Sequence, residues 1–217
     1  MNIKLNEKQK EVIEKSLNII NEFNMVNFQP YINTLNEYID IELDKKEDIG
    51  KMILTAQTKL ASNLENNIKL TEFGESVLSA FKKTQNDNWS FTDSEVEAIS
   101  FSTEATLRLG LGQIGYGRDI LMTSFAKIDT ENFVDIASLF DKAEQELDCR
   151  YGIFSKYVKE EVRNAYDIHQ VLRNYISWKR NPEGGIGVSF DRPMKTGSEP
   201  LVEVVKEEKK SKNKFKV

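Results

Sequence analysis

The chain of 217 residues has few of the side chains that most often carry chemistry or cross-links. It contains one cysteine, Cys149, and one histidine, His169. A single cysteine excludes an internal disulfide, which is typical of proteins in a reducing cytoplasm. A ferritin-like di-iron site needs two Glu-x-x-His motifs, and Tyr166 lies three residues before the only histidine. A zinc site would need carboxylates to complete its ligand set. We therefore expect no metal and no cofactor.

Long hydrophobic runs and an excess of basic residues are also lacking. No apolar run approaches the length that crosses a membrane, and the start, MNIKLNEKQKEVIEK, has no apolar signal-peptide core. These features predict a cytoplasmic protein without a membrane partner. Lys and Arg number 30 against 35 Asp and Glu, which gives a net charge of −5. A general nucleic-acid binder usually presents a dominant basic face, so nucleic acid is not an expected partner.

Proline is scarce outside one segment. Three of the four prolines and four of the eleven glycines lie between Ser177 and Leu201. Elsewhere the apolar residues recur at three- and four-residue spacing, as on amphipathic helices. Apolar residues make up 39% of the chain, which is enough for a core. The sequence therefore predicts an all-α protein, a helical bundle of six to seven helices with a C-terminal extended strap and a charged tail.

The expected helices can be placed approximately from their apolar spacing and their starts. They cover about residues 7–23, 30–43, 49–64, 71–81, 92–125, 129–152 and 155–179. Asn6 is suited to cap the first helix, and Thr92 with Glu95 forms a capping box at the fifth. The polar connector 82–88 divides an N-terminal helical region, 1–84, from a C-terminal unit, 90–200. A charged tail, 203–217, follows.

The segment NPEGGIGVSFDRP is the predicted strap. Ile186, Val188 and Phe190 alternate with small residues, a pattern that favours an extended segment packed on one face. We expect it to staple the C-terminal helices near the glycines at 110–117. The stretch 201–205 is a second candidate for extended structure. The tail KEEKKSKNKFKV carries six lysines against two glutamates.

The segment GLGQIG, Gly110 to Gly115, matches the pattern G-x-G-x-x-G, and Gly117 follows it. A dinucleotide-binding loop needs a strand before this pattern and a helix after it. Because the preceding residues are predicted to be helical, a dinucleotide site is disfavoured. Glycines inside a helix are costly, so a helix break, close backbone packing or a bound ligand must account for them.

A ligand-binding hypothesis combines this glycine patch with nearby cationic and aromatic residues. Exposed backbone at glycines, arginine and an aromatic ring are suited to phosphates and bases. The candidate ligand-binding residues are Gly112, Gln113, Arg118, His169, Arg173 and Trp178. The alternative is a structural role for these residues. His169 would then form a hydrogen bond with a neighbouring residue, and the basic residues would lie in the last turn of the final helix because the helix dipole favours positive charge there. A Cys149–His169 nucleophile pair has no flanking signature, so we predict no catalytic residues and no enzyme.

Two stretches resemble a set of uncharacterised small helical proteins of phages and Gram-positive genomes. They are FTDSEVEAISFSTEATLRLGLGQIGYGRDIL and AYDIHQVLRNYISWKRNPEGGIGVSFDRPMK. The shared pattern is a capped helix ending in Gly112 and Gln113, a Tyr-Asp helix with a basic Trp-containing end, and a Pro-Glu-Gly-Gly strap. The resemblance covers residues 92–200, about half the chain, and carries no activity. It implies a phage or mobile-element origin and one folded unit that includes the strap.

Three functions remain open on the sequence. The leading one is a non-enzymatic binding protein of phage or mobile-element origin that acts on a host protein, such as a defence component. A phage protein is the alternative protein partner. The second is a protein that binds or sequesters a small molecule, such as a nucleotide signal. The third is a structural or assembly protein whose helices form a homo-oligomer.

Overall fold

The computed structural model describes residues 2–64, 68–184 and 192–205. Two short strands and a 3-10 turn accompany the helices of these ranges. The elements are β1 (Asn2–Lys4), α1 (Glu7–Asn24), α2 (Gln29–Tyr38), α3 (Leu43–Leu64), α4 (Glu72–Thr84), α5 (Asp93–Gly110), η1 (Ile114–Tyr116), α6 (Gly117–Ser124), α7 (Thr130–Leu147), α8 (Glu160–Arg180) and β2 (Glu203–Val205). The predicted all-α helical bundle is confirmed. The described residues form eight α-helices, because the helix expected at 92–125 is divided into α5, η1 and α6.

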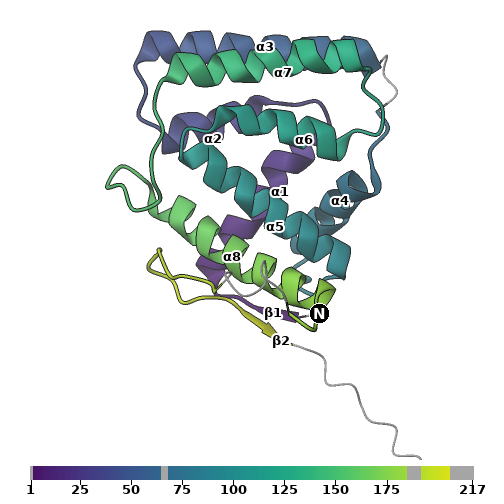
Figure 1. The fold of residues 1–217 in the computed structure, drawn as a ribbon, viewed down its shortest axis with the longest axis vertical. Coiled ribbons are helices and arrows are strands. Elements are labelled where there is room, and N and C mark those ends of the chain that lie inside the picture. Colours follow the sequence, from purple (N-terminus) through teal and green to yellow (C-terminus); the bar gives the residue numbers. More distant parts are fainter. Residues whose placement is uncertain (1, 65–67, 185–191, 206–217) are drawn as a thin grey trace, which may run out of the picture.

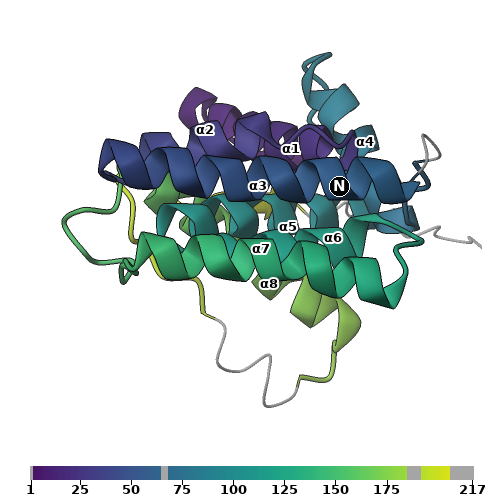
Figure 2. The ribbon, with the colours of Figure 1, turned by 90° about the horizontal axis from the view of Figure 1, so that it is seen from above.

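The helices are arranged in layers (Figure 1). The long helices α3 and α7 lie side by side across the top of the molecule, and they remain adjacent in the view from above (Figure 2). Lys59 Nζ lies 2.7 Å from Asp135 Oδ2 and links the two helices. Below them α1, α2, α5 and α6 fill the middle. Helix α8 and the β1–β2 pair close the bottom (Figure 1).

One hydrophobic cluster joins helices from both sides of the 82–88 connector. The Phe23 and Phe28 rings stack with centroids 3.9 Å apart, and both lie 6.0 Å from the Phe140 ring of α7. The Tyr31 hydroxyl of α2 donates to the Ile114 carbonyl oxygen over 2.7 Å. Burying each such side chain contributes about 1.5–3 kcal/mol to stability. The connector therefore separates α4 from α5 along the chain without dividing this cluster.

The predicted helix starts are observed. Asn6 caps α1 in a capping box with Gln9, and Thr92 caps α5 in a capping box with Glu95. Burial disfavours the charge of Glu95, but hydrogen bonds from Lys83, the Thr92 backbone and a serine outweigh it and lower the pKa of Glu95. Side-chain caps of this kind contribute about 1 kcal/mol each.

Several predicted helix ends were wrong. The second helix, expected to reach Leu43, ends at Tyr38. The sixth, expected to end near Gly152, ends at Leu147, because Asp148 takes the left-handed conformation that glycine was expected to supply (φ 47°). The seventh, expected from about Ser155, begins at Glu160. The position at which a helix begins or ends depends on the backbone conformation of one or two residues, and apolar periodicity does not specify that conformation.

The extended stretch predicted at 201–205 is present in part. Strand β2 pairs antiparallel with β1, and Val204 lies opposite Ile3. Residues 203–205 therefore form a strand where the charged tail was predicted to begin, and the strand at Asn2–Lys4 was not predicted. The alternating strap residues Ile186, Val188 and Phe190 lie outside the described residues, and so does the tail from 206 onward.

The stretch from Met194 to Gly197, which continues the C-terminal strap beyond Pro193, is fixed to α8 by polar contacts. The buried carboxylate of Asp167 accepts from the Thr196 backbone N–H at 2.9 Å, from the Thr196 hydroxyl at 2.7 Å and from the Gly197 N–H at 2.9 Å. Gln170 exchanges two hydrogen bonds with the backbone of Met194. A buried carboxylate is tolerated only when its oxygens are hydrogen-bonded, so strap and helix depend on each other.

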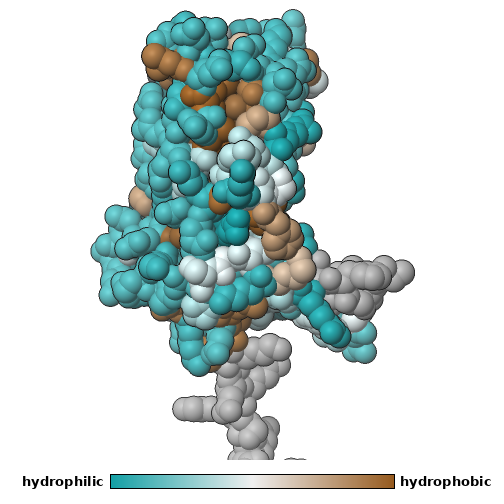
Figure 3. Space-filling model, turned by 90° about the vertical axis from the view of Figure 1, so that its left-hand side faces the viewer, coloured by the Kyte–Doolittle hydropathy of each residue, from teal (hydrophilic) through white to brown (hydrophobic). Residues whose placement is uncertain are grey.

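The surface is largely hydrophilic on the face shown in Figure 3, where hydrophobic residues form separate patches. Large exposed hydrophobic side chains come from several elements and include Leu43, Met122, Val134 and Phe154. Scattered residues of this kind are normal on soluble proteins. Among the described residues, every helix is too short or too polar to cross a membrane.

Candidate functional site

The glycine segment breaks the helix that the sequence predicted to continue to Phe125. Helix α5 ends at Gly110 and α6 begins at Gly117. A Cβ atom at Gly110 would overlap the Val162 side chain of α8, and one at Gly117 would overlap the Phe140 ring of α7. Both glycines therefore permit close packing of another helix against the backbone.

The backbone between these two glycines is also occupied. Gly112 has a φ of 80°, and the space beside its Cα is filled by the Cys149 carbonyl oxygen. The Gly115 N–H donates to Glu144 Oε2 over 2.5 Å. In a phosphate-binding loop such N–H groups must be free to donate to the phosphate. A dinucleotide-binding loop also follows a β-strand, whereas this segment follows the helix α5. Helix breakage and close packing thus account for the glycine patch without a ligand.

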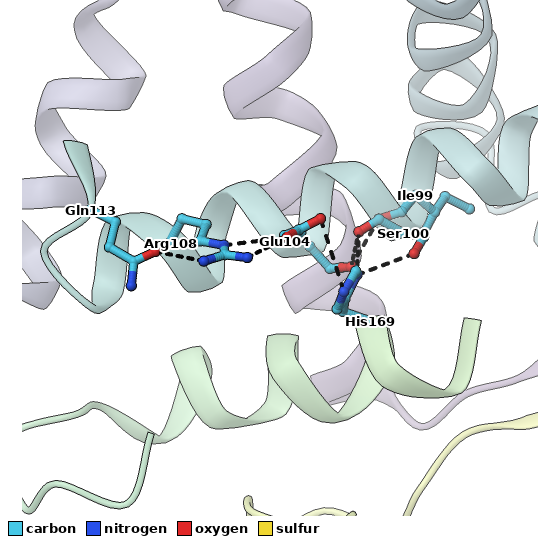
Figure 4. Close-up of polar contacts among 7 residues, drawn as sticks. Ile99, Ser100, Glu104, Arg108, Gln113 and His169 are labelled. Atoms are coloured by element: carbon cyan, nitrogen blue, oxygen red, sulfur yellow. Dashed lines mark hydrogen bonds and ion pairs between the residues drawn. The ribbon is translucent and has the colours of Figure 1, made fainter. Parts of the chain in front are cut away.

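A row of polar side chains runs along α5 toward the glycine segment (Figure 4). We call Ser100, Glu104, Arg108, Gln113 and His169 the polar row. The first three are four residues apart and share one face of α5. Arg108 donates from Nη2 to Glu104 Oε1 at 2.9 Å and from Nη1 to Gln113 Oε1 at 2.8 Å. The row therefore joins Gln113 to Glu104 through Arg108, and Glu104 Oε2 lies 4.0 Å from His169 Nε2. Glu104 and Arg108 were not among the predicted site residues.

His169 lies buried between α5 and α8. Its Nδ1 is 3.0 Å from the Ser100 carbonyl oxygen, which can only accept, so Nδ1 carries the proton. Its Nε2 is then without a proton, 4.0 Å from Glu104 Oε2. Burial lowers the pKa of His169 more than the charge of Glu104 raises it. The imidazole is therefore neutral at pH 7.

The Ser100 hydroxyl lies 3.2 Å from the same Nδ1, which raises the question of a serine nucleophile. A nucleophilic serine needs an unprotonated nitrogen to take its proton. Here Nδ1 already donates to the Ser100 carbonyl, and the serine is 5% exposed. This geometry does not activate Ser100, and the contact is best read as a hydrogen bond that joins α5 to α8.

Arg118 lies in a different place, a hollow of about 700 Å³ beside the end of α7. Its guanidinium is 3.0 Å from Asp141 Oδ1, and Arg150 on the same hollow contacts Glu144. Asp148 adds a third carboxylate to the lining. Both arginines are thus paired, and carboxylates outnumber them, so this hollow offers little attraction to an anionic ligand.

Trp178 belongs to a third place, near the C-terminal end of α8. Val171, Tyr175 and Trp178 lie on one face of the helix and line a hollow of about 500 Å³ together with Pro182 and Val204. We call this the α8 hollow. The Trp178 side chain is 45% exposed, and Lys179 is the one charged residue among the described lining residues. Arg173 is exposed on α8, where its charge helps to lower the pKa of His169.

The six residues predicted as one ligand site therefore lie in three regions. Gln113 belongs to the polar row with His169, and Gly112 precedes it in the chain, whereas Arg118 and Trp178 line separate hollows. The four-residue spacing of Ser100, Glu104 and Arg108 is a signal that could have identified the polar row. No local signal in the sequence places Val204 beside Trp178.

Compared with models of known protein families, with characterised proteins and with solved structures, the chain gave no match. Its function is therefore inferred from its own geometry. Of the three regions, the α8 hollow combines an apolar lining with an exposed aromatic side chain. It is the best candidate for contact with another molecule.

Proposed function

We propose that this chain is a non-enzymatic binding protein and that the α8 hollow is the centre of its contact with a partner protein. The resemblance to small phage proteins extends the proposal to the partner, a protein of the host cell such as a component of its defences. The observation that carries the proposal is the half-exposed Trp178 at an apolar hollow of about 500 Å³.

The composition of the α8 hollow supports a protein partner. Trp and Tyr are enriched at the energetic centres of protein interfaces, because each offers a large apolar area at a small entropic cost. Val171, Tyr175 and Trp178 are spaced by four and three residues, so α8 presents them as one continuous stripe. Val204 of β2 lines the same hollow, so a second element adds apolar area to that of the helix.

The other hollows support a partner less well. The hollow beside α7 is lined by Arg118 and Arg150, whose charges are already paired. A further hollow, of about 360 Å³ between α1, α2 and α8, is lined mainly by lysines and glutamates. Charged side chains that must be desolvated contribute little net affinity, whereas apolar area contributes directly.

The proposal is tested by photo-crosslinking in host lysate. The full chain carries a photo-reactive phenylalanine analogue at the position of Trp178, and a matched chain carries it at Phe154. Phe154 is 69% exposed and precedes α8, while at 1.5 Å per residue about 27 Å of helix separates Glu160 from Trp178. We expect one host protein to be cross-linked from position 178 and not from 154.

The partner identified in this way is then purified and titrated. Trp178→Ala should weaken its binding by about thirtyfold, which corresponds to about 2 kcal/mol at an interface hot spot. Phe154→Ala should leave the dissociation constant unchanged. A partner that binds Trp178→Ala as tightly as the unaltered chain would place the contact elsewhere, and the absence of any specific crosslink would count against a host partner.

A further inference from the structure

A hollow of about 360 Å³ lies where α1, the end of α2 and the start of α8 meet. We call it the acidic hollow. Its lining includes Glu11 and Val12 of α1, Tyr38 of α2, and Glu161 and Asn164 of α8. Three helices therefore contribute to one space, and its volume is within the range that small ligands occupy.

Carboxylates outnumber ammonium groups in the acidic hollow. Four glutamates and two lysines, Lys8 and Lys15, line it. Lys15 Nζ lies 2.6 Å from Glu37 Oε1, whereas Lys8 Nζ lies 2.9 Å from the carboxylate of Glu199, which is outside the lining. Among the described residues, only one of the four glutamates therefore has an ion pair. The other three leave negative charge that a cation would neutralise.

These three glutamates are Glu11, Glu160 and Glu161. The last two lie in the first turn of α8, where the helix dipole favours negative charge without any ligand. Glu11 has no such explanation. The hydrogen bond and the charge of Glu199 are the main causes that raise the pKa of Lys8, and the charges of Glu160 and Glu11 add to them. One group of carboxylates therefore lies beside Lys8.

A second group of carboxylates lies beside the Tyr38 ring. Burial raises the pKa of the Tyr38 hydroxyl, the charge of Lys15 opposes this, and the charges of Glu37 and Glu161 add to the rise. The side chains of Tyr38 and Val12 are themselves buried where they line the hollow. The hollow thus combines negative charge at two places with apolar surface.

This combination suits an organic cation better than a metal ion. Among the described residues, no three His, Cys, Asp or Glu side chains are grouped so that they could hold a metal ion together. The apolar surface of Val12 and Tyr38 is suited to methylene groups, which gain free energy when they leave water. Two places of negative charge match a ligand that carries two ammonium groups.

Asn164 is an independent indication of a ligand. It is 6% exposed and lines the hollow, yet its side-chain amide has no hydrogen bond to a described residue. Its Oδ1 is buried against Gly197. Rotation of the amide by 180° would therefore break no hydrogen bond with a described residue, and it would exchange the positions of oxygen and nitrogen. An unpaired buried amide is destabilising, and an ammonium group in the hollow would supply a donor.

We infer that the acidic hollow binds a small organic dication, a diamine or polyamine. One ammonium group pairs with Glu11 and Glu160, the other pairs with Glu161, and the methylene chain between them lies on Val12 and Tyr38. This inference does not depend on the proposed protein partner, because the described linings of the acidic hollow and the α8 hollow share no residue.

The test is a titration of the ¹⁵N-labelled full chain with 1,4-diaminobutane at low ionic strength, followed by amide chemical shifts. We expect saturable shifts at Glu11, Tyr38 and Asn164, including the side-chain amide of Asn164, with a dissociation constant below about 1 mM. The matched ligand 1-aminobutane has the same chain and one ammonium group. It should bind about tenfold more weakly, because one charged hydrogen-bonded contact is lost.

Two variants of the chain locate the charges that matter. Glu11→Gln and Glu161→Gln replace exposed side chains, so both variants should fold, and each should weaken diamine binding about tenfold. Glu131→Gln, at the exposed start of α7, removes the same charge and should leave the dissociation constant unchanged. Trp178→Ala should bind the diamine as tightly as the unaltered chain.

The results that overturn this inference leave the proposed function standing. Equal weakening by Glu11→Gln and Glu131→Gln would reduce the effect to general attraction by a chain of net charge −5. Equal affinity for the two amines would overturn the dication and leave a place for one ammonium group, such as a lysine side chain of another protein. Shifts that do not saturate by about 10 mM would overturn binding altogether. The crosslinking experiment at Trp178 judges the protein partner separately.

Discussion

At the scale of single residues, His169 makes the stability of the fold depend on pH. Burial lowers its pKa below the value near 6.5 of an exposed histidine. Between these two pKa values the unfolded chain binds a proton that the folded chain does not. The free energy of unfolding should therefore fall as the pH drops through 6.5, and this loss should end below the folded pKa. Above pH 7.5 the histidine contributes no pH dependence.

Urea unfolding at pH 7.5 and pH 5.5 measures this effect against the variant His169→Gln. Glutamine retains an N–H donor for the Ser100 carbonyl and cannot be protonated, so the difference in stability between the two pH values should shrink. The charged groups around His169 are Glu104, Arg108 and Arg173. An unchanged pH dependence in the glutamine variant would assign the effect to one of the other titrating groups of the protein.

Asp167 is the second residue whose effect can be isolated. Its carboxylate holds the backbone N–H groups of Thr196 and Gly197. Asp167→Ala would leave these two N–H donors unpaired and would leave the Thr196 hydroxyl only the longer contact, 3.3 Å, with the Arg163 carbonyl oxygen. We therefore expect a loss of about 3 kcal/mol of stability in denaturant unfolding. Asp135→Ala is the matched control, because this exposed carboxylate bonds Lys59 alone among the described residues and its removal should change little. Equal effects of the two substitutions would contradict a structural role for the strap contact.

At the scale of elements, alanine substitutions at two glycines distinguish the effect of packing on stability from the effect of helix propensity. Gly50 lies in α3 with nothing within 4 Å of an added Cβ, whereas the same atom at Gly117 in α6 would overlap Phe140. Gly50→Ala should therefore stabilise the protein by about 0.5–1 kcal/mol through the better helix propensity of alanine. Gly117→Ala should destabilise it by about 1–3 kcal/mol, because the overlap forces a side chain or the backbone to move.

Thermal unfolding of the two glycine variants shows whether Gly50→Ala raises the stability while Gly117→Ala lowers it. The contrast is informative because Gly117 has helical backbone angles (φ −53°, ψ −32°), so its substitution introduces no strain from a left-handed conformation. A stabilised Gly117→Ala would mean that α6 and α7 are less closely packed than the structure indicates. It would also reopen the glycine patch as a site for a ligand.

At the scale of the whole molecule, the shared aromatic cluster predicts a single unfolding transition. Phe140 of α7 contacts Phe23 of α1, Tyr31 of α2 and Phe28, which lies between these two helices. Phe140→Ala should cost about 3–5 kcal/mol. Native-state hydrogen exchange should become faster in α1 and α7 to the same extent. Acceleration confined to residues after the 82–88 connector would instead indicate two separately folding units.

The extent of successful prediction differs between fold and site. The all-α architecture and the capped starts at Asn6 and Thr92 were predicted correctly, since they depend on periodicity and on residues three positions apart. The division of the helix after Gly110 was only one of several alternatives. The candidate site residues could not be assembled correctly, because their grouping depends on how α5, α7 and α8 cross. Arg118 and Trp178 were combined in one hypothesis, yet they line different hollows.

The sequence by itself determined the helical character of the chain, the N-caps of α1 and α5, and the low content of metal-binding and nucleophilic side chains. These properties arise from interactions within about four residues along the chain. Tertiary structure alone decided that the glycines serve packing, that Asp167 anchors the strap and that Val204 joins Trp178 at the α8 hollow. Lys4 and Glu203, which bond across the β1–β2 pair at 2.8 Å, are 199 residues apart. Contacts at such separations are selected by the packing of the whole chain, which no local pattern encodes.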